Sequence, residues 1–157
     1  ILEFAEKHPE LNWVFKPHPC LYNFLFMSGY MTKDDADEYY KRWHDVGIVC
    51  EDGDYMQLFQ NSIAMITDCG SFLTEYFFTK QPCIHLVSQY FKGNENVKRI
   101  CETYYNVHNA DEMNKFFEEV LIYKNDPKKQ ERLALLKKLN YPNSAEFIVE
   151  DILKNLL

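Results

Sequence analysis

The chain has 157 residues, of which 46% are hydrophobic and 16% aromatic, as in a globular protein with a sizeable core. Its net charge of −7 and pI of ≈ 5.2 argue against binding of nucleic acid or anionic membranes through bulk charge. No apolar run reaches the roughly 18 residues that span a bilayer, and no signal peptide is recognisable. The first residue, Ile1, lies inside a predicted helix, so we expect a fragment of a longer protein.

The first half of the chain alternates between helices and strands. The segment 1–8 is predicted to be a helix that Pro9 ends, and 12–15 a short strand. Thr32 and Asp35 have the spacing of a capping box and begin an amphipathic helix. The other predictions for this half are a packed loop or short helix (20–31), a strand (47–50) and a short helix (55–60). This alternation predicts a parallel sheet with helices on both faces.

The stretch 63–87 reads as a strand, a turn, a helix and a second strand. Residues 63–66 are apolar and partly β-branched, as in a buried strand, and 83–87 have the same character. Between them, the polar turn 67–71 leads into a helix that ends before Pro82. The result is a βαβ unit, and open α/β sheets bind ligands at the carboxyl ends of their strands.

The remainder is mainly helical, with a helix at 97–104 and a short edge strand at 105–108. Further helices are predicted to begin at Asn109 (with Glu112), at Asp126-Pro127 and at Asn143 (with Glu146). The predicted fold class is therefore α/β, a Rossmann-like open parallel sheet with helices on both faces and a C-terminal helical tail. Residues 1–157 fit one domain.

The five cysteines are Cys20, Cys50, Cys69, Cys83 and Cys101. Their number is odd, no CxxC pair occurs and several lie in apolar segments, so we expect reduced core thiols. A zinc site is not expected, and reduced thiols favour the cytoplasm.

The turn at 67–71 contains the first candidate binding residues. Ser71 lies at the start of a predicted helix, where its hydroxyl and the backbone N–H groups accept a phosphate, while Gly70 allows close approach. An ordinary helix cap is the alternative for Ser71. Glu75, one helical turn later, is placed to accept hydrogen bonds from vicinal ligand hydroxyls, or is a solvated surface residue. A loop-ordering role is expected for Asp68, because its carboxylate would repel phosphate.

His18 is the second candidate, because Lys16-Pro17-His18-Pro19 directly follows a predicted strand. Proline cannot continue a central strand, so we expect a stiff loop that presents His18 at the strand's carboxyl end. As His⁺ it would stabilise phosphate charge, and Lys16 would add to this. The chain contains no GxGxxG, Walker A, HExxH or GxSxG sequence, which disfavours the corresponding NAD-binding, P-loop, zinc-protease and hydrolase classes.

The run WVFKPHP at 13–19 and the run ITDCGS at 66–71, with Glu75 and Pro82, resemble the carboxyl-terminal, donor-binding domain of the CDP-glycerol glycerophosphotransferases. These are two-domain (GT-B type) enzymes that build teichoic acids and related phosphopolymers. The family pattern is KPHP followed by a TDYSS-like turn and an acidic residue four positions after the second serine. Here KPHP is intact, Asp68, Ser71 and Glu75 match, and Cys69-Gly70 replaces Tyr-Ser. That replacement removes a phosphate-contacting hydroxyl and leaves the exact donor open.

The resemblance implies that an acceptor hydroxyl of a polyol-phosphate or polysaccharide attacks the β-phosphorus of CDP-glycerol or a related donor and expels CMP. It implies His18 as the catalytic residue, Lys16, Gly70, Ser71 and Glu75 as donor-binding residues and Asp68 as the loop-ordering residue. It implies no metal, cofactor or nucleic acid. The acceptor domain would lie outside this chain, which alone would bind donor without turnover. The implied location is the cytoplasm, at the inner membrane face, with peripheral membrane attachment through absent regions.

Two alternatives remain open. UDP-N-acetylglucosamine 2-epimerases and related sugar transferases have a DSGG-like turn with an acidic residue at the same offset, and the turn 68–71 is equally close to that pattern. The KPHP segment favours the phosphotransferases. The other alternative is a non-catalytic α/β interaction module such as a receiver domain, which would have an acidic pair after its first strand where KPHP stands here.

Overall fold

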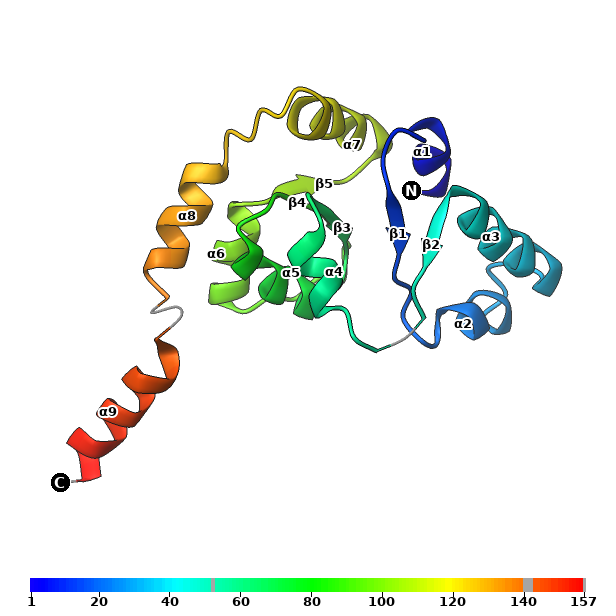
Figure 1. Ribbon diagram of the computed structural model, residues 1–157. Helices are drawn as coiled ribbons and strands as arrows, with labels where there is room; N and C mark the ends of the chain where they lie inside the picture. The colour runs from blue at the N-terminus through cyan, green and yellow to red at the C-terminus, as the bar shows by residue number, and fades with distance from the viewer. Residues whose placement is uncertain (52, 140–142, 157) are drawn as a thin grey trace. The chain divides into compact units, whose positions relative to one another are not determined.

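The computed structural model describes residues 1–51, 53–139 and 143–156, and this part of the chain has a mixed α/β fold (Figure 1). It divides into two compact units, Ile1–Tyr55 (unit 1) and Met56–Leu157 (unit 2), which are described in turn. The described residues of each unit form one small sheet, and all strand pairs in the two sheets are parallel. The α/β class and the parallel pairing predicted from the sequence are confirmed.

Unit 1 builds a two-stranded sheet with an aromatic core on one of its faces. Its elements are α1 (Leu2–Lys7), β1 (Trp13–Phe15), α2 (Leu21–Met27), α3 (Lys33–Val46) and β2 (Gly47–Val49). Leu2, Ala5 and Trp43 are buried together, and the Phe15 ring stacks on Trp43 with 4.5 Å between centroids. The predicted helix and strand at the start of the chain are confirmed as α1 and β1.

The opposite face of this sheet carries two exposed apolar side chains. Side chains alternate along a strand, so Val14 and Ile48, which pair in register, point away from the core. They are 41% and 67% exposed, respectively. Parallel sheets are normally covered on both faces, which makes this pair of apolar side chains an unusual feature of unit 1.

The start of α3 confirms the predicted capping box. Thr32 Oγ1 accepts a hydrogen bond from the Asp35 N–H at 3.1 Å, and the Thr32 N–H donates to the Asp35 carboxylate at 3.2 Å. Two otherwise unpaired donors are satisfied reciprocally. The segment 20–31, predicted as a packed loop or short helix, contains α2, which has no buried residue.

Gly47 on β2 pairs with Trp13 on β1 and leaves no room for a side chain. A Cβ added at Gly47 would lie 2.9 Å from Trp13 Cβ and nearer still to the Trp13 carbonyl oxygen. Gly47 has an ordinary extended conformation, with φ −166°. The position therefore requires glycine for steric reasons and not for its backbone freedom.

Gly47→Ala is expected to lower the free energy of unfolding by about 1–3 kcal/mol, because the methyl group overpacks the strand contact. Urea denaturation measures this difference. Gly53→Ala is the control, since its Cβ would meet no atom within 4 Å, and we expect a change of about 0.5 kcal/mol or less. Equally small effects for both variants would contradict the close approach at Gly47.

Unit 2 contains a three-stranded sheet in the order β3-β4-β5. Its elements are α4 (Met56–Asn61), β3 (Met65–Thr67), α5 (Gly70–Tyr76), the 3-10 helix η1 (Phe77–Thr79), β4 (Cys83–Leu86), α6 (Glu95–Glu102), β5 (Tyr105–Val107), α7 (Ala110–Phe116), its π-helical continuation η2 (Phe117–Ile122), α8 (Lys129–Lys137) and α9 (Ser144–Leu156). The predicted βαβ unit is confirmed as β3, α5 and β4. β3 begins two residues later than predicted, and Ile63 is 61% exposed.

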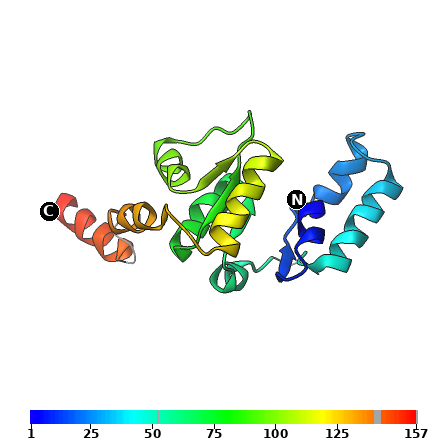
Figure 2. The same ribbon diagram turned by 90° about the horizontal axis from the view of Figure 1, so that it is seen from above.

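Helices cover both faces of this sheet, as predicted. Tyr105 points toward α7, where its ring centroid lies 4.6 Å from that of Phe116. The next residue, Asn106, points the other way and donates to the Cys101 carbonyl of α6 at 3.1 Å. Because α5 packs beside α6, these two helices share one face and α7 covers the other (Figures 1 and 2).

Among the described residues of unit 2, the buried tyrosines are Tyr76, Tyr104 and Tyr105. The Tyr76 hydroxyl shares a hydrogen bond of 2.8 Å with Ser62 Oγ, and the Tyr104 hydroxyl donates to the Leu73 carbonyl at 3.1 Å. Burial raises the pKa of Tyr76 to about 12 and also raises the pKa values of Tyr104 and Tyr105. The folded state therefore strongly favours the neutral phenols.

Unit 2 is expected to lose stability in alkaline solution. Tyrosine in an unfolded chain ionises near pH 10, and the folded pKa values are higher. The stabilisation is therefore complete below about pH 10 and is lost as the pH rises toward the folded pKa. For Tyr76 the loss up to pH ~12 is about 3 kcal/mol. Urea denaturation at increasing pH, followed with tyrosinate absorbance, measures this loss; ionisation of every tyrosine near pH ~10 without unfolding would contradict it.

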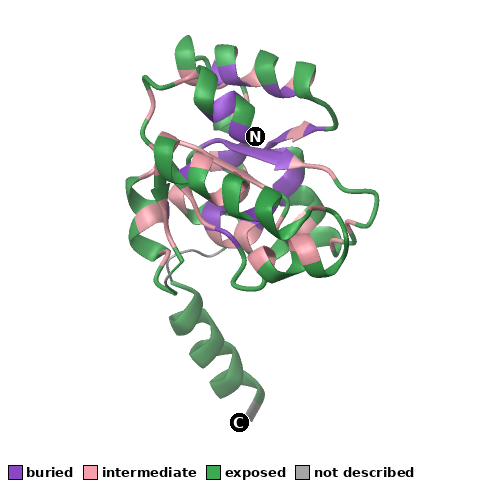
Figure 3. Ribbon diagram, turned by 90° about the vertical axis from the view of Figure 1, so that its right-hand side faces the viewer, coloured by how far each residue is buried: buried purple, intermediate pink, exposed green. Residues whose placement is uncertain are grey.

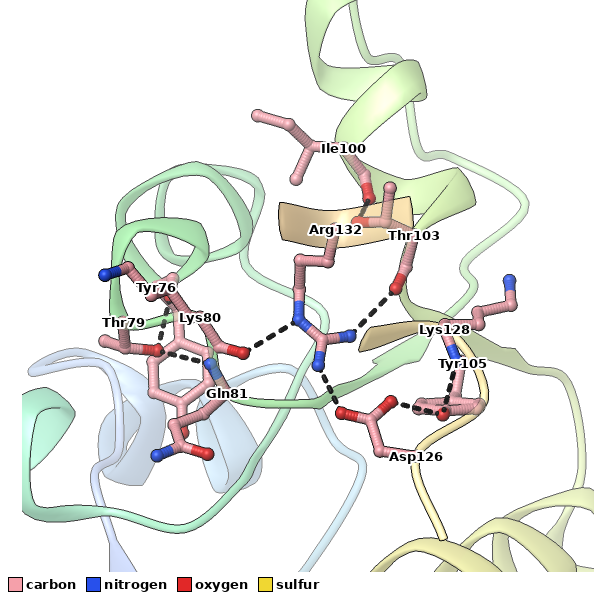
Figure 4. Close-up of polar contacts among 10 residues, drawn as sticks. All are labelled: Tyr76, Thr79, Lys80, Gln81, Ile100, Thr103, Tyr105, Asp126, Lys128 and Arg132. Atoms are coloured by element: carbon pink, nitrogen blue, oxygen red, sulfur yellow. Dashed lines mark hydrogen bonds and ion pairs between the residues drawn. The ribbon is translucent and has the colours of Figure 1, made fainter. Parts of the chain in front are cut away.

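Arg132 on α8 is 1% exposed and binds the chain at the amino-terminal edge of the sheet (Figure 4). Its Nε donates to the Lys80 carbonyl at 3.0 Å, just before β4, and its Nη1 donates to the Thr103 carbonyl at 3.2 Å, just before β5. Its Nη2 forms an ion pair with Asp126, which also accepts a hydrogen bond of 2.7 Å from the Tyr105 hydroxyl. One guanidinium thus connects α8 to the starts of two strands.

Arg132→Met is expected to lower the free energy of unfolding by about 3–5 kcal/mol, because it leaves the Asp126 carboxylate and two carbonyls without their donor. Arg42→Met is the matched control, since Arg42 forms an exposed ion pair with Glu6 at 2.8 Å. An exposed pair contributes about 1 kcal/mol or less. Urea denaturation of both variants tests the difference, and similar small losses would show that the buried guanidinium is dispensable.

One helix start predicted from the sequence, at Asp126-Pro127, is wrong. Asp126-Pro127 was expected to cap and begin a helix, but α8 begins at Lys129 with Lys128 as its N-cap residue and no side-chain capping hydrogen bond. The Asp126 carboxylate is bonded instead to Arg132 and Tyr105. The cap predicted at Asn109 is confirmed, because its side-chain oxygen accepts from the Glu112 N–H at 2.9 Å.

The cysteines are all free thiols, but they are not all in the core. Cys83 and Cys101 are buried, and burial raises the pKa of both thiols. Cys20 is exposed, which corrects the expectation of a core position for it.

The last helix, α9, is exposed along its described length (Figure 3). Its exposed apolar side chains are Phe147, Ile148, Val149, Ile152 and Leu153. Within the residues that the structure describes, no helix combines the length and apolarity needed to cross a membrane.

Candidate functional site

The Lys16–Pro19 segment follows β1, as the two prolines predicted. Phe15 makes the last strand contact, accepting from the Cys50 N–H at 2.8 Å. Lys16 is then half-buried, Pro17 is buried and His18 is exposed. The buried proline anchors a loop that presents the histidine to solvent at the carboxyl end of the strand.

His18 is held by the backbone on its carboxyl side. Its Nδ1 accepts a hydrogen bond from the Cys20 N–H at 3.1 Å, and its carbonyl accepts from the Leu21 N–H at 2.8 Å, where α2 begins. Because Nδ1 acts as an acceptor, the hydrogen of the neutral ring lies on Nε2. The exposed imidazole is therefore oriented to donate one hydrogen bond from Nε2 to an anionic oxygen.

The β3–α5 turn is ordered by Thr67, whose Oγ1 accepts from the Cys69 N–H at 3.1 Å. Cys69 is the N-cap residue of α5, has extended backbone angles and makes no side-chain capping hydrogen bond. Ser71 lies within the first turn of α5 and is not the cap; its Oγ is 3.3 Å from Cys69 Sγ. The predicted position of Ser71 at a helix start is confirmed, and its hydroxyl is exposed.

Gly70, the first residue of α5, is not required by the fold. A Cβ added there would meet no atom within 4 Å, and Gly70 does not have a positive φ. Alanine would also favour the helix. Packing and backbone conformation therefore do not account for a glycine at this exposed helix start.

Asp68 precedes the start of α5 in the sequence, and Glu75 follows it. Asp68 is exposed, and the hydrogen bond that orders the turn comes from Thr67, so the loop-ordering role of Asp68 stays a prediction. Glu75 is half-buried on α5, one turn after Ser71, and residues four apart share a helix face. The carboxylate and the serine hydroxyl therefore stand on the same side of α5.

The candidate residues form two groups, one in each unit. Lys16 and His18 lie together in the loop after β1 of unit 1. Asp68, Gly70, Ser71 and Glu75 lie together in the turn after β3 and the first turns of α5, in unit 2. Each group follows the carboxyl end of a parallel strand.

Sequence reasoning missed Thr67 and a polar pair beside it. His85 is buried on β4, and its Nδ1 is hydrogen-bonded to Asn106 Oδ1 at 2.8 Å. The register aligns both with Thr67 in one row across the sheet. The sequence signal that could have indicated this pair is His85 itself, a polar residue inside the otherwise apolar run 83–87.

Comparison with known proteins returned no match to any family model, any curated protein or any solved structure.

Proposed function

We propose that this chain is the donor-binding part of a transferase that uses a CDP-activated polyol, such as CDP-glycerol, and releases CMP. The observation that carries the proposal is Gly70, an unconstrained glycine at the exposed start of a helix that follows a parallel strand. Such helix starts bind phosphate through their free N–H groups. Ser71 adds a hydroxyl, and Gly70 leaves room for a diphosphate to approach the turn backbone.

The proposal includes a more specific fold than the α/β class described above. This fold is one Rossmann-like sheet, of the kind found in the carboxyl-terminal half of a GT-B enzyme. Its support is the parallel strand pairing within each unit, because open parallel sheets of this kind bind ligands at the carboxyl ends of their strands.

In the proposed reaction, an acceptor hydroxyl of a polyol-phosphate or polysaccharide attacks the β-phosphorus of the donor. A new P–O bond forms to the acceptor oxygen, whose proton passes to a general base in the acceptor domain. The bond from the β-phosphorus to the bridging oxygen breaks, and CMP leaves with that oxygen and its negative charge. His18 Nε2–H and Lys16 stabilise this charge, which is the main requirement of phosphoryl chemistry. The α5 N–H groups and Ser71 hold the other phosphate of the substrate, the β-phosphate that is transferred. Glu75 accepts hydrogen bonds from the hydroxyl groups of the CDP-activated substrate. The acceptor domain and the inner-membrane location stay part of the proposal.

A UDP-sugar enzyme, either a GT-B glycosyltransferase or a UDP-N-acetylglucosamine 2-epimerase, is the second candidate. The glycine in the 68–71 turn favours it, since DSGG-like turns also place glycine beside the phosphates. The two candidates share the phosphate site and differ in the nucleobase and in the hydroxyl-bearing group. A non-catalytic interaction module is the third candidate, and the exposed apolar residues of α9 are the observation in its favour.

Calorimetric titration of the 157-residue chain with CDP-glycerol, CMP and UDP-N-acetylglucosamine tests the proposal. We expect the cytidine nucleotides to bind and His18→Ala and Ser71→Ala each to weaken binding about tenfold, the effect of losing one hydrogen bond to a charged group. Gly70→Ala is expected to weaken binding further while leaving the chain folded, since only the ligand meets the new methyl group. Gly53→Ala is the control.

Preference for UDP-N-acetylglucosamine would select the second candidate. Equal binding by Gly70→Ala and the unchanged protein would remove the observation on which the proposal depends. If neither the cytidine nor the uridine ligand binds, the interaction module becomes the better explanation.

A further inference from the structure

His85 is a buried polar residue that the proposed chemistry does not use. It is 2% exposed and lies on β4, the central strand of unit 2. Its register partners are Thr67, the last residue of β3, and Asn106 on β5. Because the 68–71 turn directly follows Thr67, His85 lies in the row of the sheet next to the candidate phosphate site.

Asn106 determines which ring nitrogen of His85 carries the hydrogen. The Asn106 amide donates through Nδ2 to the Cys101 carbonyl at 3.1 Å, which directs its Oδ1 toward His85 Nδ1, 2.8 Å away. An amide oxygen only accepts, so Nδ1 donates and Nε2 keeps its lone pair. The same contact to α6 shows that this row faces the side of the sheet covered by α5 and α6.

The Nε2 lone pair has no partner. Among the described residues, His85 Nε2 and Trp43 Nε1 are the buried side-chain atoms without a hydrogen bond. Trp43 belongs to the aromatic core of unit 1, whereas His85 adjoins a candidate binding turn. An unmade buried hydrogen bond costs roughly 1–3 kcal/mol. The Asn106 contact alone does not explain a histidine here, since a shorter amide side chain would provide it.

Phe91 covers the His85 ring from the segment between β4 and α6. The two ring centroids are 4.7 Å apart, at an interplanar angle of 64°. Phe91 is half-buried and sits in a short turn, where its N–H donates to the Ser88 carbonyl at 3.0 Å; its neighbours Gln89 and Tyr90 are exposed. The cover on His85 is therefore a half-buried residue that lies outside the sheet.

We propose that His85 Nε2 accepts a hydrogen bond from a ligand hydroxyl group at the carboxyl edge of this sheet, and that Phe91 turns aside as the ligand enters. This inference rests on the proposed function, whose donor carries hydroxyls on its ribose and its polyol. A lone pair repels phosphate oxygens and attracts hydroxyl hydrogens. The hydrogen-bond acceptor Nε2 of His85 and the N–H donors at the start of α5 would thus bind different parts of one ligand.

Two substitutions separate the ring nitrogens. Asn at position 85 mimics the Nδ1 side of histidine and keeps the contact to Asn106, whereas Gln reaches the position of Nε2 with a carbonyl oxygen. We expect His85→Asn to weaken CDP-glycerol binding about tenfold and His85→Gln to bind within about threefold of the unchanged chain. A parallel titration with CMP identifies the hydroxyl: loss with both ligands indicates the ribose, and loss with CDP-glycerol alone indicates the polyol.

The control is His108→Gln, which changes an exposed histidine of the same unit. A purely structural His85 predicts the reverse order, with His85→Asn closer to the unchanged protein in both melting temperature and affinity. That result, or unchanged affinity in His85→Asn, overturns the inference while the proposed function stands. Failure of the unchanged chain to bind any cytidine nucleotide overturns both. In ¹⁵N-histidine NMR, we expect CDP-glycerol to shift the Nε2 resonance of His85 more than its Nδ1 resonance.

Discussion

Unit 2 depends on the burial of one positive charge. Arg132 donates to carbonyls that lie shortly before β4 and β5, and its charge is balanced by Asp126. Burying an unpaired guanidinium would cost several kcal/mol, so these partners have to be in place together. The amino-terminal edge of the sheet is thereby hydrogen-bonded to α8. At the opposite edge, the β3–α5 turn is exposed and available to a ligand.

This division of the two edges is consistent with the chemistry of the candidate residues. Arg132 uses its donors on carbonyls of the chain itself and on Asp126, whereas the start of α5 is exposed and has no side-chain cap. His18 in unit 1 is held locally, because its Nδ1 accepts from the Cys20 N–H and its Nε2–H is left to donate outward. In that loop, a local hydrogen bond orients a donor that the fold itself does not use.

The sequence predicted the features that depend on near neighbours. Apolar runs and turns identified the βαβ unit, the prolines identified the loop around His18, and the spacings of Thr32 with Asp35 and Asn109 with Glu112 identified two caps. It could not predict features that depend on distant partners. Asp126-Pro127 has the pattern of a helix start, but a buried guanidinium takes its carboxylate. Likewise, the row of Thr67, His85 and Asn106 exists only through strand register.

Arg132 also has a consequence for the order in which the chain becomes structured during synthesis. The carbonyls that it satisfies belong to residues 52 and 29 positions earlier, at Lys80 and Thr103. A nascent chain that has emerged only as far as β5 holds these carbonyls without their donor, and Asp126 has not yet been made. In a nascent chain, the amino-terminal edge of this sheet can therefore reach its native hydrogen bonding only after Arg132 on α8 has been made.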